Sequence, residues 1–322
     1  MDIPAALRFK RSLQLVGLLG TCIVAVLMSV SAPAGIQGSG FSSLAVTGTV
    51  TAVGDGSITV GDVTYPTSGA TFTIDGEPGD QAQLHNGDVV SLRGTVSPNG
   101  RQSSISEVIF NGNVQGPVSG IDGQSGSFFV LQQTVHVDSQ TIFGSGIEPA
   151  SLAGLQDGEV VEVSAFANSA GELVASRVEV KGQNSGAQVV GALQALDTAG
   201  QTFRINALAV DYHSAQVEGV LAEGTTVVVR GVNNGAVTLA ASRVDVSPAV
   251  KGDPGAVGRI EGLITNFASS SYFEVDGQPV AVDSQTKLHL HGPLGLDVAV
   301  KVSGTFDVNG VLVARKVKGS AR

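Results

Sequence analysis

Apolar residues recur at every second position in short runs along the chain, and clusters of glycine and polar residues separate these runs. A period of two is typical of antiparallel β-strands that turn one face toward a core. In the run 160–166, the predicted outer face carries Glu162 and Ser164 between apolar residues. In the run 173–180, the residues predicted to share one face are Val174, Ser176, Val178 and Val180. The pattern therefore predicts an all-β protein.

Two short segments recur, which predicts an internal repeat. The segment ASRV at 175–178 recurs at 241–244 and, loosely, at 314–317. The segment VDSQT at 137–141 recurs identically at 282–286. Superimposing the copies predicts four tandem β domains, at 46–110, 113–182, 188–248 and 257–319.

Each domain is predicted to contain five strands, with one helical turn between the third strand and the fourth. The predicted first strands are 47–53, 114–121, 189–196 and 259–264, and the fourth strands are 89–96, 160–166, 226–232 and 298–306. The third strand is predicted to contain VDSQT, and the helical turn is clearest at 151–155. This order is that of a small antiparallel OB-like Greek-key barrel, although a plain meander or small sandwich would give a similar pattern. The short polar linkers predict a semi-rigid rod.

Two sets of side chains are predicted to hold the domains together. The phenylalanines predicted to fill the cores are Phe72, Phe129, Phe143, Phe166, Phe203, Phe273 and Phe306. The recurring residues that form a structural repeat signature are Asp138, Thr141, Asp283, Thr286, Arg177, Arg243 and Arg315. We expect the signature aspartates to bond backbone amides where the third strand ends.

The first 34 residues read as an export signal. Three basic residues precede the apolar run 13–30, and small residues at Ala32 and Ala34 predict cleavage before Gly35. Retention as a membrane anchor and lipidation at Cys22 are the alternatives. Residues 35–45 are predicted to be a flexible spacer, and the remaining chain is predicted to be extracytoplasmic, in the periplasm, in the cell envelope or secreted.

Charge and cysteine content exclude one class of partner and two kinds of covalent or metal site. The formal net charge is −10, and an acidic surface repels phosphate backbones, so we expect no nucleic-acid partner. The only cysteine, Cys22, lies in the leader. The exported part is therefore predicted to contain no disulfide and no thiolate metal site.

The sequence contains few candidate reactive groups. His289 and His291 are spaced to share one face of a strand, as two metal ligands would be, but a third ligand of suitable spacing is missing. The acidic turn 75–80 lacks the ligand series of a calcium loop. No nucleophile elbow, phosphate-binding loop or repeated histidine position occurs. We therefore expect no enzymatic activity, no resident metal and no cofactor.

Several segments resemble a known family. They are SGATFTIDGEPG at 68–79, LQQTVHVDSQTIF at 131–143 and GELVASRVEV at 171–180. They resemble the bacterial domain-of-unknown-function family numbered 5666 (DUF5666), and the resemblance covers most of 46–319. It implies exported proteins, often lipoproteins, with tandem OB-like β domains, and it implies no activity. The lipidated cysteine common in that family has no counterpart near the glycine-rich spacer of this chain.

Together these observations predict a non-catalytic protein of the cell envelope or extracellular space that acts as a structural spacer or interaction module. Its partner would be an unidentified protein or glycan, with membrane contact only through the N-terminal segment. The alternative is a periplasmic protein that binds an oligosaccharide or another small polar ligand on an OB-type face.

Overall fold

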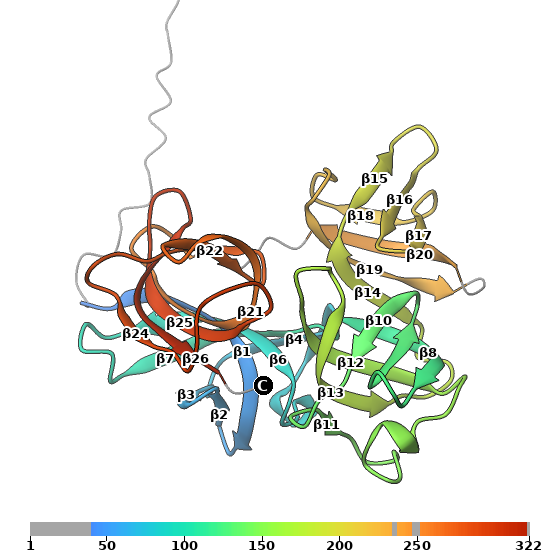
Figure 1. Ribbon diagram of the computed structural model, residues 1–322, viewed down its shortest axis with the longest axis horizontal. Helices are drawn as coiled ribbons and strands as arrows, with labels where there is room; N and C mark the ends of the chain where they lie inside the picture. Colours follow the sequence, from blue (N-terminus) through green and yellow to red (C-terminus); the bar gives the residue numbers. More distant parts are fainter. Residues whose placement is uncertain (1–39, 234–236, 247–251, 321–322) are drawn as a thin grey trace, which may run out of the picture. The chain divides into compact units, whose positions relative to one another are not determined.

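The computed structural model describes residues 40–233, 237–246 and 252–320 (Figure 1). This part of the chain is all-β: it contains 26 strands and two short 3-10 turns. Within these ranges no helix is long and apolar enough to cross a membrane. The predicted leader 1–34, with Cys22, lies outside the described residues.

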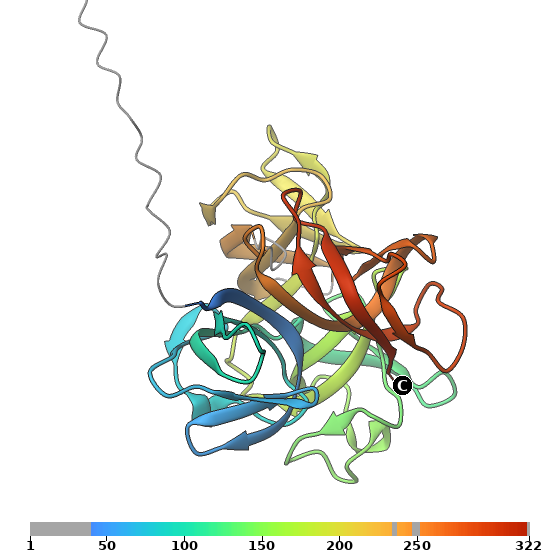
Figure 2. The same ribbon diagram turned by 90° about the vertical axis from the view of Figure 1, so that its left-hand side faces the viewer.

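Two sheets of 13 strands contain all these strands. The first sheet takes its strands from both ends of the described chain: β1 (Ser42–Gly54), β2 (Ser57–Val60), β3 (Val63–Pro66), β4 (Thr71–Ile74), β5 (Glu77–Gly79), β6 (Val89–Val96), β7 (Ser103–Phe110), β21 (Val257–Ser269), β22 (Tyr272–Val275), β23 (Gln278–Ala281), β24 (Lys287–His289), β25 (Ala299–Phe306) and β26 (Leu312–Gly319). In Figure 2 the blue-to-teal part of this sheet curls into a barrel.

The second sheet takes its strands from the middle of the chain: β8 (Val114–Asp122), β9 (Ser127–Val130), β10 (Gln133–His136), β11 (Ile142–Phe143), β12 (Val160–Ala167), β13 (Leu173–Val180), β14 (Ala187–Ala192), β15 (Gln194–Asp197), β16 (Thr202–Ile205), β17 (Leu208–Asp211), β18 (Gln216–Glu218), β19 (Thr226–Asn233) and β20 (Thr238–Val246). The 3-10 turns are η1 (Gln81–Gln83) and η2 (Leu152–Gly154). The run 189–196, predicted as one strand, is split between β14 and β15.

One antiparallel ladder of three strands recurs along the chain. Its copies are β1–β6–β7, β8–β12–β13, β14–β19–β20 and β21–β25–β26. The last two strands of each ladder form a hairpin. Most of these strands match the predicted runs closely, because each run is apolar at alternate positions and ends at a glycine or polar turn.

Every one of these hairpins contains a β-bulge at the same place. The pairing shifts between Arg93 and Gly94, Ser164 and Ala165, Arg230 and Gly231, and Ser303 and Gly304. The residues that the shift leaves unpaired are Ser106, Ser176, Ser242 and Arg315. A bulge reverses the alternation of faces beyond it. Val178 therefore joins the core with Leu173 and Ala175, and the predicted shared face of Val174, Ser176, Val178 and Val180 is wrong.

The cores are apolar clusters of Val, Leu, Ile and a few aromatic residues, one in β1–β7, one in β21–β26 and one continuous across β8–β20. Phe203, Phe273 and Phe306 lie in the cores as predicted, while Phe72 and Phe143 are partly buried. Phe166 is buried outside the core cluster of its ladder and lies near Gly262 of the other sheet. The prediction for Phe129 is wrong, because that ring is 42% exposed and its neighbour Phe128 is fully buried.

Strand β12 is buried on both faces. Val161, Val163 and Ala165 lie in the core, but Glu162 and Ser164 are also only 5% and 2% exposed. The predicted solvent-facing side of this strand is therefore wrong. Its second face is covered by other segments of the chain, and alternation alone cannot reveal such a contact.

The first and last segments are joined by a parallel seam. Strand β1 pairs with β21 from Leu44↔Val257 to Thr47↔Ile260. A rod of successive units would keep these segments apart, so that prediction is wrong. Strand β1 also begins inside the predicted spacer 35–45, because Leu44 and Ala45 are buried by this pairing and the adjoining core.

Candidate functional site

The VDSQT segments are turns between two short strands. Strand β10 ends at His136, and the Asp138 carboxylate accepts the Gln140 N–H at 2.8 Å. The Thr141 hydroxyl donates to the carbonyl of Ala175 at 2.8 Å, beside the bulge of β13. The second copy repeats these bonds through Asp283, Gln285, Thr286 and Ala314. The prediction that VDSQT lies within the third strand is wrong, because these side chains bond the backbone into a turn.

Replacing the signature threonine by valine should destabilise the fold without changing its shape. Thr141→Val or Thr286→Val removes the hydroxyl that bonds the bulge carbonyl, and we expect a loss of about 1–2 kcal/mol in the free energy of unfolding. Chemical denaturation measures this loss. Ser139→Ala and Ser284→Ala, at exposed positions of the same motif, are the matched controls. Equal stability of the threonine and serine variants would contradict a structural role for the signature.

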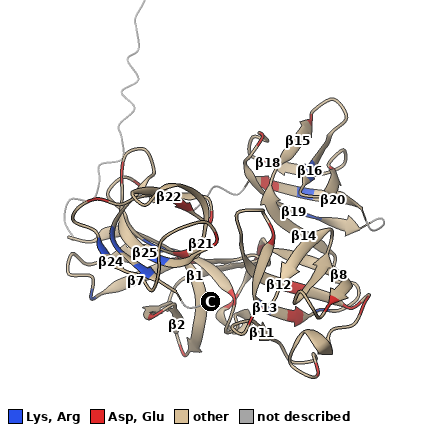
Figure 3. Ribbon diagram, in the orientation of Figure 1, with Lys and Arg blue, Asp and Glu red and all other residues tan. Residues whose placement is uncertain are grey.

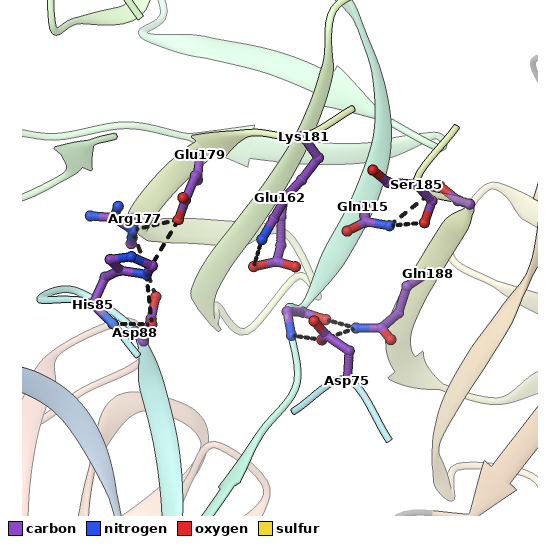
Figure 4. A network of polar contacts seen from close by, with 12 residues as sticks. Asp75, His85, Asp88, Gln115, Glu162, Arg177, Glu179, Lys181, Ser185 and Gln188 are labelled. Atoms are coloured by element: carbon purple, nitrogen blue, oxygen red, sulfur yellow. Dashed lines mark hydrogen bonds and ion pairs between the residues drawn. The ribbon is translucent and has the colours of Figure 1, made fainter. Parts of the chain in front are cut away.

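Arg177 lies in a polar network between β13 and the segment before β6, shown in Figure 4. Its side chain is mostly buried and lies 3.1 Å from Glu179 and 3.8 Å from Asp88. It also donates to the carbonyl of Asn86 at 3.2 Å. Burial raises the pKa of Asp88 to about 6, although the His85 N–H and Arg177 favour its charged form. Arg177 is thus a contact between the two sheets rather than an isolated repeat residue.

Glu162 lies in a second polar cluster, with Asp75, Lys181 and Gln188. Its Oε1 is 3.4 Å from the Lys181 ammonium. Among the described residues, its buried Oε2 has no hydrogen-bond partner. Burial, and then the Asp75 carboxylate, raise the pKa of Glu162 to about 8. Gln188 donates to Asp75 at 3.0 Å and thereby joins β14 to the loop after β4.

The other two signature arginines differ from Arg177. Arg243 bonds Asp245 and Glu218, each at 2.9 Å, and so ties β18 to β20. Arg315 is exposed and is the unpaired bulge residue, whereas Lys316 occupies the register position of Arg177 opposite Ser303. The prediction that Arg315 belongs to the repeat signature is therefore wrong, because its neighbour Lys316 is the structural counterpart of Arg177.

The two candidate metal ligands do not share a strand. Strand β24 ends at His289, His291 follows it, and both are exposed. Asp297 is an acidic residue near these histidines in the sequence, but its carboxylate accepts hydrogen bonds from the N–H and the hydroxyl of Ser169. Within the described residues, no group of three His, Cys, Asp or Glu is placed to hold a metal ion.

A cavity of about 210 Å³ opens at the seam between β1 and β21. Its ionisable lining residues come from both ends of the described chain: Tyr65, Asp62, Arg259, Glu261, Lys301, Lys316 and Lys318. Arg259 donates to the Tyr65 hydroxyl at 2.8 Å, and its guanidinium lies 5.9 Å from the centre of the ring. Burial raises the pKa of Tyr65 even though Arg259 opposes this shift, so the phenol stays protonated at neutral pH.

Sequence reasoning missed this cavity because its wall is assembled across the seam. The only available signal was the recurrence of basic residues, Lys301 in one strand and Lys316 and Lys318 in the next. The pairing of β1 with β21 then places Arg259 beside Val46.

Comparison with known proteins gives one result. A family model described as a domain of unknown function, DUF5666, matches residues 47–102, 115–179 and 261–318. These ranges correspond to the ladders that begin with β1, β8 and β21. No curated protein matches the chain. Since the family model matches more than half of its residues, the chain belongs to the DUF5666 family of domains of unknown function.

Proposed function

We propose that this protein is a non-catalytic, exported scaffold or interaction module of the cell envelope. In this proposal it is built from four five-stranded OB-like units, each centred on one of the recurring ladders. Its partner is a protein or glycan outside the cytoplasm. The basic, apolar and small-residue pattern of the first 34 residues supports export.

The observation that carries the proposal is the way in which the ladders are joined. Strand β1 pairs with β21, and β8 pairs with β14. Hydrogen bonds add to these pairings: Val89 N–H of the first sheet donates to the Ser164 hydroxyl of the second at 2.8 Å, and Arg230 of the second sheet donates at 2.8 Å to Asn111, in the segment that links the sheets. Such contacts hold several faces in fixed relation, as a scaffold requires, whereas independent units on linkers would not.

Intact-mass measurement and calorimetry of the exported protein test this proposal. The full chain is expressed with its own leader in a Gram-negative host and recovered from the periplasm or medium. We expect an intact mass that corresponds to a chain starting at Gly35, and one cooperative unfolding transition for the joined ladders. Retention of the whole chain in the cytoplasm would contradict export. Separate transitions for single ladders would contradict the scaffold.

Binding of a small polar ligand is the second candidate function, and the seam cavity supports it. The charged side chains around that cavity come from three ladder strands and from the β2–β3 hairpin. A spacer has no need for such convergence, because convergent polar groups in a concave site are the usual mark of ligand recognition.

A further inference from the structure

Five cations gather on one face of the ladder β21–β25–β26 and its neighbour β24. We call this set, Arg259, Lys287, Lys301, Lys316 and Lys318, the basic face. Strand pairing aligns them: Arg259 lies opposite Ser303, which lies opposite Lys316, and Lys316 lies opposite Lys287. Figure 3 shows the corresponding blue segments around β24 and β25. A basic face is unexpected in a chain with a net charge of −10.

The basic face contains like charges in direct opposition. Lys301 pairs with Lys318 across β25 and β26, and Lys316 pairs with Lys287 across β26 and β24. Like charges directly opposite each other destabilise a sheet. Lys301 has a carboxylate partner, Glu261, at 3.2 Å. Within the described ranges, Lys287, Lys316 and Lys318 form no ion pair. These three side chains are exposed, so only water and dissolved ions screen their charges.

Four of these cations line the seam cavity, against the two carboxylates of Asp62 and Glu261. Glu261 is occupied by Lys301 and by the Thr49 N–H, so it neutralises little of the remaining charge. Arg259 uses one N–H on Tyr65 and keeps others free of ion pairs with described residues. The Tyr65 hydroxyl accepts from Arg259, which leaves its own proton as a donor at the cavity wall.

We propose that the seam cavity binds an oxyanion, the carboxylate or phosphate group of a small ligand, through Arg259, Lys316 and Lys318. Charge-assisted hydrogen bonds from arginine and lysine are the usual means of holding such groups. The bound anion would relieve the repulsion between the opposed lysines. This inference specifies the ligand class of the second candidate function, and it does not depend on the scaffold role.

Titration calorimetry with three defined probes tests the proposal. Inorganic phosphate represents phosphate ligands, galacturonate represents carboxylate ligands, and galactose is the neutral counterpart of galacturonate. The protein is purified from a host that expresses the full chain. We expect saturable binding of phosphate or galacturonate, and the one that binds more tightly identifies the source of the oxyanion.

The double variant Lys316→Gln/Lys318→Gln should weaken that binding at least about tenfold, because it removes two of the four cavity cations. Both lysines are exposed, so the fold should survive. Without ligand, the variant should melt no lower than the parent, since it also removes opposed like charges. The matched control, Arg101→Gln/Arg204→Gln, removes two exposed cations elsewhere and should bind as the parent does.

Three results would overturn the proposal. Unsaturable or absent binding of both anions would do so, as would equal loss of affinity in the two double variants. Equal affinity for galactose and galacturonate, with no tighter binding of phosphate, would also overturn it, while leaving a ligand-binding function in place. Failure of the scaffold proposal is a separate result, because it is detected by the unfolding transitions rather than by ligand affinity.

Discussion

Raising the pH from about 5 to about 8 should lower the free energy of unfolding, and Glu162→Gln should remove the part of this loss above pH 6. The pKa of Glu162 is raised to about 8 by burial and by Asp75, so the folded chain holds a proton that the unfolded chain releases near pH 4.5. The stabilising contribution is therefore complete below about pH 4.5 and is lost as the pH rises through 8. The slope is about 1.4 kcal/mol per pH unit in that range.

Asp88 also lowers the free energy of unfolding as the pH rises, but over a lower pH range. Its pKa is raised to about 6 by burial, so its contribution is lost as the pH rises through 6. Glutamine at position 162 has the shape of the protonated acid and does not titrate. The variant should thus keep only the Asp88 part of the slope below pH 6, show no slope from this pair above it, and be more stable than the parent at pH 8 and above.

Urea denaturation at a series of pH values measures both slopes. Glu77→Gln, at an exposed carboxylate that begins β5, is the control and should follow the parent. An unchanged slope between pH 6 and 8 in the Glu162→Gln variant would show that Glu162 is ionised and solvated in the folded protein.

Phe128→Ala should cost about 3–5 kcal/mol of unfolding free energy, whereas Phe129→Ala should cost about 1 kcal/mol or less. Phe128 is fully buried in the core shared by β8–β20, and it lies opposite Val135 in the register of β9 and β10. Removing its ring leaves a cavity that the surrounding strands cannot fill. Phe129 is 42% exposed, and its ring lies against Gly120.

The two variants control each other, because they remove the same ring from adjacent positions of one strand. Thermal or chemical denaturation compares them directly. A larger loss for Phe129→Ala would mean that β9 is paired one residue out of register, with its faces exchanged.

Local structure could be predicted from this sequence wherever a strand and its turn carry their own signal. The β12–β13 and β25–β26 hairpins are examples, because Gly and Asn turns separate runs of alternating apolar residues. Faces within those strands were harder to predict. Phe128 and Phe129 are adjacent in β9, so only the alternation of the neighbouring residues decides which of them is buried. In β13, the bulge at Ser176 reverses the alternation of buried and exposed positions.

Contacts between ladders produce no periodic pattern in the sequence. The sequence alone predicts that Glu162 faces outward from β12 and that Arg177 is a surface residue. In the structure the loop after β4 covers Glu162, and Arg177 contacts Asp88. The seam cavity depends on β1 pairing with β21. Those strands are far apart in sequence, and neither contains a residue that marks the other as its partner.

The pairing of β1 with β21 has a consequence for the order in which the protein can fold. Synthesis runs from the amino terminus, so residues 44–47 leave the ribosome long before residues 257–260, their partners in the seam. During that interval one edge of β1 offers unpaired N–H and C=O groups to any extended segment nearby. A chain that stops before residue 257 keeps this edge open permanently. The carboxyl-terminal ladder therefore protects the earliest strand from strand-to-strand association between molecules.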